Sequence, residues 1–446
     1  MASTYTYYTQ TTPTDNNKWT LSMWVKRAEL GTVQNLVGAW DDGSNHCIFR
    51  FNADNQLDWY DYQDPASFQL KTNRVFRDVG AWYHLVFVWD SDNVTEADRM
   101  QTWVNGVRET SYATSDYPTS GASTVINVSG RVVEIGRRSD GGYFSGEMSH
   151  VQFVDGLALA PTEFGSVDAT SGIWKIKTSC YATPGNNGVC LKMEDRTNLD
   201  LDSSSNAFTF TTSGTLTPTY DNPSNNFATM NPLDNYYPDA TFSNGNNTVV
   251  TVSNQYAPTT STLGMSAGKW YWEVKPTTMP NDELLPGIIS TQPVAVGDEV
   301  GDYPNDYGYY AYNGKKVTDS VQTTYGDTFS NNDIISVALD LDNLKLYWAK
   351  NGTWQDSGDP TSGATGTGAA FTVTAPALTD LGTYFMAVTH WHSTVCTWNA
   401  NFGNGYFGTT AVTSAEADGD GIGAFEYAPP TGYFTLCTKN IKAYGG

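Results

Sequence analysis

Two short segments combine aromatic rings with carboxylates in a way that suits sugar recognition. One is Trp59-Tyr60-Asp61-Tyr62-Gln63-Asp64 and the other is Asp302-Tyr303-Pro304-Asn305-Asp306-Tyr307. Aromatic faces stack on pyranose rings, and Asp and Asn side chains accept hydrogen bonds from sugar hydroxyls. We predict that both segments lie in loops and bind a glycan or a partner through Trp59, Tyr60, Asp61, Tyr62, Asp302, Tyr303, Asn305, Asp306 and Tyr307. The alternative is that these rings pack the loops against a sandwich core or against another subunit.

Oxygen-rich turns offer the ligands that calcium prefers. Asp41-Asp42-Gly43-Ser44-Asn45 is one such turn and Asp418-Gly419-Asp420-Gly421 is another. Hard cations require several oxygen ligands, and Asp41 with Asp42 is the better pair of candidates. Ordinary Asx turns explain both segments equally well.

His390 and His392 form the other candidate metal site. On a strand they share a face, which Cys396 also shares if the strand continues unbroken, and imidazole with thiolate binds zinc-like metals. We favour the simpler interpretation, in which both histidines bond to neighbouring loops. No cofactor is therefore expected, with calcium as the alternative.

The elements that must position these residues are strands. Trp19-Thr20-Leu21-Ser22-Met23-Trp24-Val25-Lys26 alternates apolar and polar residues, and Tyr83–Trp89 is apolar on both faces, as in a central sandwich strand. Asn-Gly pairs between apolar residues predict tight hairpins at Asn105-Gly106, Asn313-Gly314 and Asn351-Gly352. No segment of about 12 residues has helical periodicity. The sequence predicts an all-β fold of two antiparallel sandwich modules.

Composition excludes several classes of protein. The 446 residues carry 24 Lys and Arg against 47 Asp and Glu, which gives a net charge of −23. That charge argues against binding to nucleic acid or to anionic membranes. The 13% aromatic content excludes an acidic disordered chain. No apolar stretch of about 18 residues exists and the N-terminus does not resemble a signal peptide.

The chain is predicted to divide at two polar stretches, 198–226 and 409–423. We expect a docking arm over residues 1–16, sandwiches over 17–215 and 216–408, and a C-terminal extension over 409–446. Cys180 and Cys190 flank a strong turn, so they either form a disulfide across a hairpin or remain reduced packing thiols.

The first sandwich contains KWTLSMWVKR at 18–27, WYHLVFVWD at 82–90, WVNGV at 103–107, and EIGRR followed by YFSGEMSHVQFVDGLALAP at 143–161. Through these segments it resembles a laminin-G-like, concanavalin-type jelly roll. These segments occur in the order that the family shows and cover about 150 residues. The resemblance implies that a glycoside hydrolase must also be considered, since a concanavalin-type jelly roll can host one.

The second sandwich contains GKWYWEVKP at 268–276, GYYAYNGKK at 308–316, DIISVALDLDNLKLYWAKNGTW at 333–354 and Asn401-Phe402-Gly403. Through these segments it resembles a SPRY domain. SPRY domains are bent β-sandwiches whose loops bind partners, and they are not enzymes. The segment 302–307 falls where such domains have a variable loop.

The order of the two modules resembles structural proteins of tailed phages, particularly marine ones. PSNNFATMNPLD at 223–234 and FEYAPPTGYFTLCTKNI at 425–441 add to this resemblance. It implies a capsid decoration, head fibre or tail fibre, assembled in the host cytoplasm and released by lysis. The implied partners are other virion proteins and host-surface carbohydrate, with a homotrimer by analogy with fibres.

A catalytic role is not expected. A retaining glycosidase requires two carboxylates about 5 Å apart, and the family version places Glu-x-Asp-x-(x)-Glu on one strand. Glu96-Ala97-Asp98 lacks the final Glu. His84 lies in a central strand and is more consistent with a packed histidine than with a base. Non-enzymatic glycan binding on a virion is our first hypothesis, a cement or adaptor protein the second, and a polysaccharide depolymerase the third.

Overall fold

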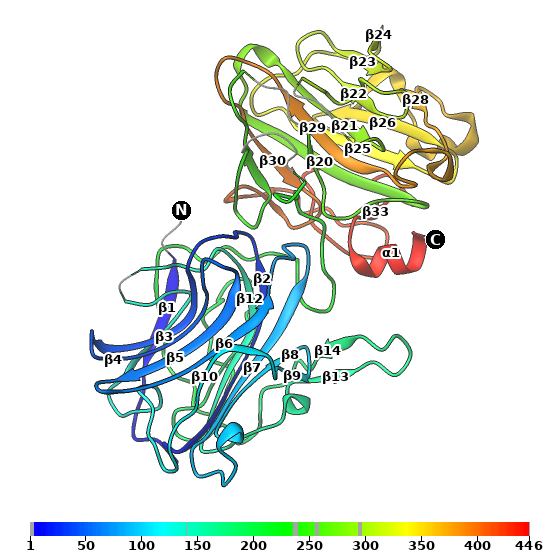
Figure 1. The fold of residues 1–446 in the computed structure, drawn as a ribbon. Coiled ribbons are helices and arrows are strands. Elements are labelled where there is room, and N and C mark those ends of the chain that lie inside the picture. The colour runs from blue at the N-terminus through cyan, green and yellow to red at the C-terminus, as the bar shows by residue number, and fades with distance from the viewer. Residues whose placement is uncertain (1–3, 140, 235–239, 255–257, 293–296, 446) are drawn as a thin grey trace. The chain divides into compact units, whose positions relative to one another are not determined.

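The computed structural model describes residues 4–139, 141–234, 240–254, 258–292 and 297–445. The chain divides into two compact units, Met1–Pro218 and Thr219–Gly446, and each is built on its own pair of large sheets (Figure 1). The only α-helix among the described residues is α1, Thr438–Tyr444. The predicted all-β fold of two antiparallel sandwiches is confirmed. No helix in the described part of the chain is long and apolar enough to cross a membrane.

The first unit pairs an eight-stranded sheet with a six-stranded sheet. In spatial order the eight strands are β10 (Tyr112–Asp116), β6 (Ala66–Val75), β5 (Gln56–Gln63), β4 (Asn45–Phe51), β3 (Gln34–Asp42), β11 (Val132–Ile135), β1 (Tyr5–Thr9) and β16 (Thr211–Ser213). The six are β15 (Val189–Leu191), β12 (Gly146–Asp155), β2 (Lys18–Arg27), β7 (Trp82–Asp90), β8 (Met100–Val104) and β9 (Val107–Arg108).

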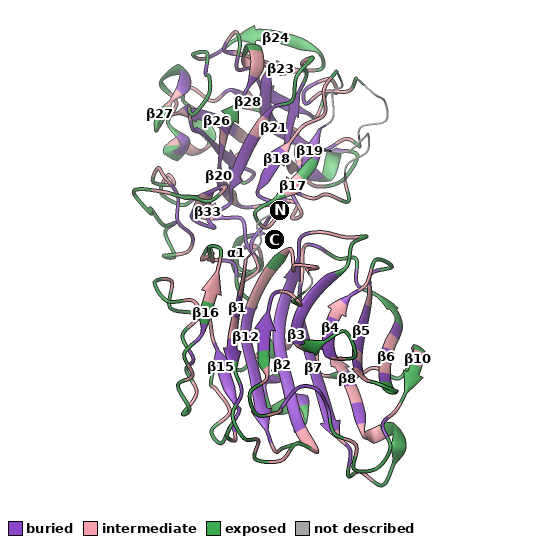
Figure 2. Cartoon of the chain, turned by 90° about the vertical axis from the view of Figure 1, so that its left-hand side faces the viewer, coloured by how far each residue is buried: buried purple, intermediate pink, exposed green. Residues whose placement is uncertain are grey.

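The core of the first unit lies between these two sheets (Figure 2). Strand alternation sends every second side chain inward, so Trp19, Trp59 and Trp89 meet there with ring centroids 5.3–6.2 Å apart. Strand β7 lies between β2 and β8, as its two apolar faces predict. Asn105 and Gly106 adopt φ values of 49° and 77° in the turn between β8 and β9, so the Asn-Gly hairpin is confirmed there.

A small hairpin covers the outer face of the six-stranded sheet. It consists of β13 (Gly165–Val167) and β14 (Trp174–Ile176). Trp174 lies against Gly106, where an added Cβ would come within 2.4 Å of the indole ring. The indole N–H of Trp174 donates to Nδ1 of His84 over 2.9 Å. This contact, with the Ser22 hydroxyl 2.9 Å from Nε2, makes His84 a packed histidine.

The N-terminal segment is part of the sandwich, which corrects the predicted docking arm over residues 1–16. Strand β1 pairs with β11 on one side and β16 on the other, and Tyr8 is buried in the core. The sequence of this segment is polar, and only one face of the five-residue strand β1 points inward. Composition therefore does not predict that the segment is part of the sandwich.

The second unit also contains two large sheets. One contains β17 (Thr241–Ser243), β18 (Thr248–Val250), β30 (Thr397–Asn401), β20 (Lys269–Thr278), β25 (Ile335–Asp340), β26 (Lys345–Lys350) and β27 (Thr353–Trp354), with β28 (Phe371–Thr372) beside β26 and β33 (Phe434–Thr435) beside β20. The other contains β19 (Thr259–Thr260), β29 (Phe385–His390), β21 (Leu284–Ile289), β22 (Tyr307–Tyr309), β23 (Lys315–Thr318) and β24 (Val321–Thr324). A separate short pair joins β31 (Tyr406–Phe407) to β32 (Thr410–Ala411).

The C-terminal segment packs onto the second unit and is not a separate extension. Strand β33 pairs in parallel with β20, and Leu436 belongs to the core between the sheets. Phe425 and Tyr433 cover Tyr271 on the opposite face of the same sheet. The boundary between the units, after Pro218, lies three residues beyond the predicted one.

Cys180 and Cys190 form a disulfide with Cα atoms 5.9 Å apart. Cys190 lies in β15 at the edge of the six-stranded sheet, so the bond ties the preceding segment to that edge. The disulfide alternative of the sequence prediction is confirmed. Cys47, Cys396 and Cys437 are free and buried.

Candidate functional site

The outward side of the eight-stranded sheet carries a row of aromatic side chains. Strand pairing places Trp40 of β3 opposite His46 of β4, and His46 opposite Tyr62 of β5. Tyr60 lies two residues from Tyr62 on the same face. We call the side chains of Trp40, His46, Tyr60 and Tyr62 the aromatic face.

Within the aromatic face, His46 contacts each of the other three rings. Trp40 stacks on His46 with centroids 5.1 Å apart. The centroid of His46 lies 5.6 Å from that of Tyr60 and 5.5 Å from that of Tyr62. The two tyrosine rings are nearly parallel at 6.0 Å. Three of the rings are partly exposed, whereas His46 is buried beneath them, so the face offers apolar area of the kind on which sugar rings stack.

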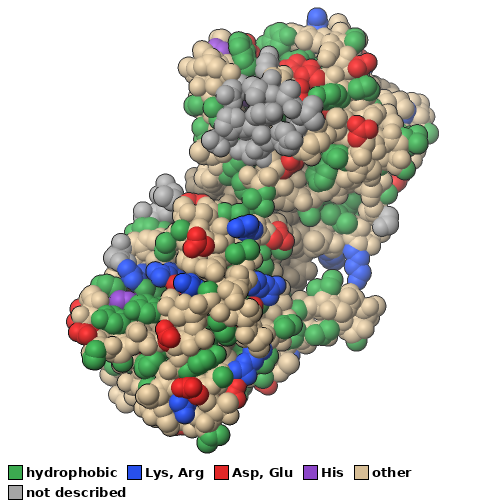
Figure 3. Space-filling model, viewed as in Figure 1, with side chains coloured by type: hydrophobic (Ala, Val, Ile, Leu, Met, Phe, Trp, Pro, Cys, Tyr) green, Lys and Arg blue, Asp and Glu red, His purple; other side chains and the backbone are tan. Residues whose placement is uncertain are grey.

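Charged groups border the aromatic face on two sides. On the same face, the Arg50 guanidinium donates to Asp58 over 2.8 Å, and Gln69 donates to the other oxygen of Asp58 over 2.7 Å. On the opposite border, the guanidinium carbon of Arg138 lies 4.9 Å from the centroid of Trp40. Figure 3 shows Lys and Arg side chains gathered beside hydrophobic ones over this part of the first unit.

A glycine lets the loop that carries Arg138 cross the sheet. At Gly38 an added Cβ would lie 3.0 Å from the Arg137 carbonyl oxygen and 3.1 Å from the Arg138 Cα. The loop therefore lies directly on β3. The neighbouring Arg137 pairs with Glu134 over 2.7 Å and stacks on Tyr5, with its guanidinium carbon 3.6 Å from the ring centroid. Both contacts stabilise the position of the loop on the sheet.

The predicted segment around Trp59 is a strand, which corrects its assignment to a loop. In β5 the side chains alternate, so Trp59 and Asp61 point into the core and are fully buried. Burial raises the pKa of Asp61 to about 6. Tyr60 and Tyr62 point outward and remain candidates, because one strand cannot present four successive residues on one face.

The segment around Tyr303 is the predicted loop, but it is largely folded onto the second unit. Asp306 is buried and accepts from the Ser290 N–H over 2.9 Å, and Tyr307 is buried in β22. Asp302, Tyr303 and Asn305 are partly exposed, and the Tyr303 hydroxyl donates to Asp298 over 3.1 Å. Of the five predicted binding residues in this segment, only these three can meet a partner, and their role in binding stays a prediction.

The two candidate calcium turns have protein partners for their carboxylates. Asp41 pairs with Arg131 over 2.9 Å, and Asp42 accepts the Ser44 N–H over 2.7 Å in an Asx turn. Asp418 is buried and accepts four N–H donors, from Asp420, Ile422, Thr435 and Asn440. Calcium binding at Asp41 and Asp42 stays a prediction.

His390 and His392 do not share a strand. Strand β29 ends at His390, whose Nδ1 lies 3.1 Å from the Thr251 hydroxyl. His392 lies beyond the strand, with Nε2 2.6 Å from the Asn281 amide nitrogen. Cys396 is buried in the core. No group of three or more His, Cys, Asp or Glu residues suited to a metal occurs in the part of the chain that the structure describes.

We expect His390 to make the second unit sensitive to acid. Burial lowers the pKa of His390 to about 4, and His392 adds a smaller effect of the same sign. The unfolded state, with a histidine pKa of about 6.5, binds more protons between these values, so the free energy of unfolding falls as the pH drops through this window. Urea unfolding of H390Q should lose about 2 kcal/mol less than wild type between about pH 7 and about pH 4.5. Equal losses in both proteins would contradict this assignment.

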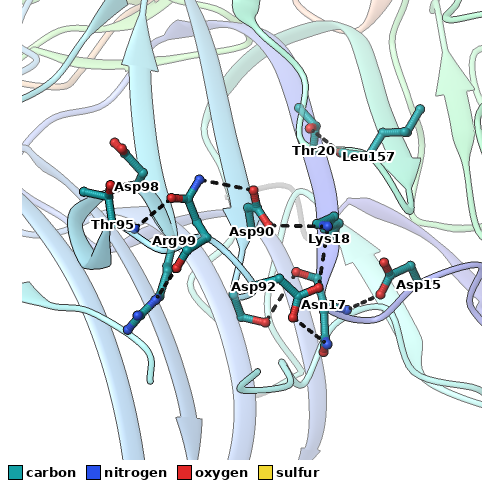
Figure 4. A network of polar contacts seen from close by, with 12 residues as sticks. Asp15, Asn17, Lys18, Thr20, Asp90, Asp92, Thr95, Asp98, Arg99 and Leu157 are labelled. Carbon is teal, nitrogen blue, oxygen red and sulfur yellow. Dashed lines mark hydrogen bonds and ion pairs between the residues drawn. The ribbon is translucent and has the colours of Figure 1, made fainter. Parts of the chain in front are cut away.

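The carboxylates near the Glu96–Asp98 segment are engaged in structural contacts (Figure 4). Lys18 lies 3.9 Å from Asp90 and 3.5 Å from Asp92, and Asp98 pairs with Arg108 over 2.6 Å. The Lys18 pairs join the start of β2 to the end of β7, and the Asp98–Arg108 pair joins the 3₁₀ turn before β8 to β9.

Sequence reasoning missed Trp40, His46, Arg50 and Arg138. The turn at Gly43-Ser44 between two alternating segments contains enough information to place Trp40 opposite His46. Arg138 comes from a loop almost 100 residues later, and no local pattern connects it with Trp40.

Comparisons with known proteins match each unit separately. A model of the concanavalin A-like lectin/glucanases superfamily matches residues 2–163, and a model of the SPRY domain matches residues 269–393. No curated protein matches the chain.

Three solved structures illustrate the similarity. The SPRY domain of human HERC1 is 16% identical with a TM-score of 0.29, over 38% of this chain and 96% of that one. A heptameric SAP-like pentraxin from Limulus polyphemus is 18% identical with a TM-score of 0.27, over 36% of this chain and 74% of that one. Domain 4 of the arabinanase AbnA from Geobacillus stearothermophilus, in complex with arabinotriose, is 18% identical with a TM-score of 0.26, over 33% of this chain and 64% of that one.

The family matches agree with the architecture, since each falls within one of the two sandwich units. The chain therefore contains a concanavalin A-like laminin G domain followed by a SPRY domain.

Proposed function

We propose that the protein is a non-catalytic binding protein that recognises carbohydrate through the aromatic face of its first unit. Its two domain types indicate a carbohydrate- or protein-binding module. The observation that carries the proposal is the contiguous row of Trp40, His46, Tyr60 and Tyr62 outside the hydrophobic core. A soluble sandwich has no need of such a row for its own packing, whereas sugar rings stack on one.

Polar groups beside the rings can fix the orientation of a bound sugar, which stacking alone does not set. Asp58 holds Arg50 on one side and Gln69 on the other, so both side chains are pre-organised. The Arg50 side chain keeps 26% of its surface exposed. Hydroxyls of a sugar lying over Tyr60 would therefore find donors already in place, at little cost in side-chain entropy.

Two features support a role without catalysis, and the proposal includes no cofactor. Asp98 is engaged in an ion pair with Arg108, and burial lowers the pKa of His84 to about 3. His84 is therefore neutral near pH 7 and does not serve as a general acid there.

We place the protein on the surface of a tailed-phage virion, docked on other virion proteins and facing host-surface glycans. This part of the proposal rests on the resemblance of the module order, and of residues 223–234 and 425–441, to structural proteins of tailed phages. A charge of −23 also suits a particle surface that must stay free of nucleic acid. Cryo-electron microscopy of purified particles tests the placement: density at capsid or tail supports it, and absence of the protein from particles overturns it.

The binding test uses the full chain and a glycan array, with wild type compared with Tyr62→Ala. We expect the variant to bind its best glycan about tenfold more weakly, because loss of a stacking ring costs about 1 kcal/mol or more. Tyr312→Ala is the matched control, since Tyr312 is an exposed tyrosine of the second unit. Retained binding in Tyr62→Ala, or the same loss in Tyr312→Ala, contradicts the assignment to the aromatic face.

A further inference from the structure

We infer that the aromatic face binds a stretch of a single neutral polysaccharide chain, which lies across the strands of the eight-stranded sheet and contacts at least three consecutive sugars. This inference rests on the carbohydrate binding proposed above and names the class of ligand. It is carried by a line of uncharged side chains that runs through the aromatic face and by the balance of charge beside that line.

The aromatic face belongs to a longer line of outward side chains that crosses the sheet. His46 lies opposite Trp40 on one side and opposite Tyr62 on the other. Residues directly opposite each other in antiparallel strands share one face of the sheet. Beyond Tyr62 the line continues to its partner Ser67 in β6, so it crosses four neighbouring strands at nearly right angles.

The same line continues on the other side of Trp40. Strand β11 pairs with β3 at Val133 and Ala39, which brings Val132 beside Trp40, and Val132 lies opposite Thr9 of β1. We call the six uncharged side chains of this line the cross-strand row: Thr9, Val132, Trp40, His46, Tyr62 and Ser67.

The exposure of the cross-strand row suits a chain of sugars better than a single sugar. Trp40 and Tyr62 are partly exposed, whereas His46 between them is buried. Two strand spacings of about 4.8 Å separate Trp40 from Tyr62, which is more than the distance between directly linked pyranose rings. Sugars that contact these two residues therefore have a third sugar between them, over His46.

The charges beside the cross-strand row favour a neutral ligand. Ion pairs border it, formed by Arg50 with Asp58, Arg137 with Glu134 and Arg131 with Asp41. Arg138 and Lys71 add positive charge, and Asp42 and Asp64 add negative charge.

His46 experiences both signs of this charge. Burial and Arg138 lower its pKa, whereas Asp42 raises it. No single sign of charge therefore dominates beside the row, and the net charge of −23 repels a polyanion.

The experiment measures binding of the full chain to β-1,4-linked gluco-, manno- and xylo-oligosaccharides of one to six sugars by titration calorimetry. The equatorial linkage keeps the chains of all three series extended. We expect at least one series to bind, with an affinity that rises about tenfold between two and three sugars, because the third sugar reaches a second ring.

Trp40→Ala should remove this rise and change the affinity for the disaccharide by no more than about twofold, since a disaccharide can still bind at Tyr62. Trp40→Phe should keep the rise, because it retains a ring. Trp391→Ala is the matched control, since Trp391 is a tryptophan of the second unit with 40% of its surface exposed. It should also keep the rise.

A second comparison tests the neutral character of the ligand. Carboxymethyl-cellulose and hydroxyethyl-cellulose share one backbone, and we expect the neutral polymer to bind more tightly at low salt. Tighter binding of the anionic polymer overturns the inference.

The length series can also overturn the inference without touching the proposed function. This is the outcome if affinity is already maximal for one or two sugars in every series, if the rise persists in Trp40→Ala, or if Trp391→Ala abolishes it. Absence of binding in all three series has the same meaning when a broad glycan array shows binding. Only absence of binding to that array overturns the proposed function as well.

Discussion

Replacing Glu273 by glutamine is expected to destabilise the second unit by about 3 kcal/mol. Glu273 is fully buried in β20. Its carboxylate accepts the N–H groups of Glu426 and Tyr427 over 3.0 and 2.9 Å, together with the Asn401 amide and the Tyr271 hydroxyl. A glutamine would turn one acceptor oxygen into an NH₂ donor facing other donors, and buried unsatisfied groups cost about 1–3 kcal/mol each.

Hydrogen exchange can distinguish the loss of the Glu273 hydrogen bonds from a general loss of packing in the second unit. Burial raises the pKa of Glu273 to about 7, although all four hydrogen-bond donors favour its charged form. The side chain therefore needs these donors to stay ionised near neutral pH. In E273Q, hydrogen exchange at the amides of Glu426 and Tyr427 should accelerate more than exchange in β25. Denaturant unfolding gives the free energy.

Glu416→Gln is the control for Glu273, because it makes the same chemical change at an exposed side chain of the C-terminal segment. It should unfold like wild type. Unchanged stability in E273Q would show that residues 409–446 do not depend on Glu273 for their attachment to the second unit.

The second large effect is expected at Asp155, at the end of β12. Asp155 is buried and accepts the N–H groups of Thr14 and Asn187 over 2.6 and 3.1 Å, and the Asn127 amide over 2.7 Å. These three partners come from segments far apart in the sequence. We expect Asp155→Asn to destabilise the first unit by about 3 kcal/mol, because an NH₂ group would face donors that need an acceptor.

Limited proteolysis reports where the first unit weakens. Cleavage near residues 10–17 should become faster in D155N, because the Asp155 carboxylate accepts hydrogen bonds from the backbone of this segment. Asp116→Asn is the control, because Asp116 is exposed in the edge strand β10. If D155N and wild type share the same unfolding midpoint and cleavage rate, the carboxylate does not anchor the N-terminal segment.

Glu273 and Asp155 also explain why the sequence predicts a docking arm and a C-terminal extension where the structure has parts of the two sandwiches. Residues 1–16 and 409–446 are polar and lack long alternating segments, so composition favours arms and extensions. Each is attached by buried carboxylates on distant strands, and such contacts leave no local pattern.

The aromatic face illustrates the same limit at the candidate site. The sequence identified Tyr60 and Tyr62 by residue type, but it placed them in a loop with Trp59 and Asp61. Alternation in β5 separates the two pairs. Periodicity could have predicted this, since Leu57, Trp59 and Asp61 share one face and Tyr60 and Tyr62 the other.

The fold class and the order of the two sandwiches can be predicted from the sequence, as can the Asn-Gly hairpin at Asn105-Gly106 and the turn that brings Cys180 to Cys190. These features depend on side-chain period and turn chemistry within a few residues. The folded structure is needed to see which rings face outward, that Arg138 contacts Trp40, and that both chain ends belong to the sandwiches. These depend on strand pairing between distant segments, whose partners are selected by the packing of the whole sheet.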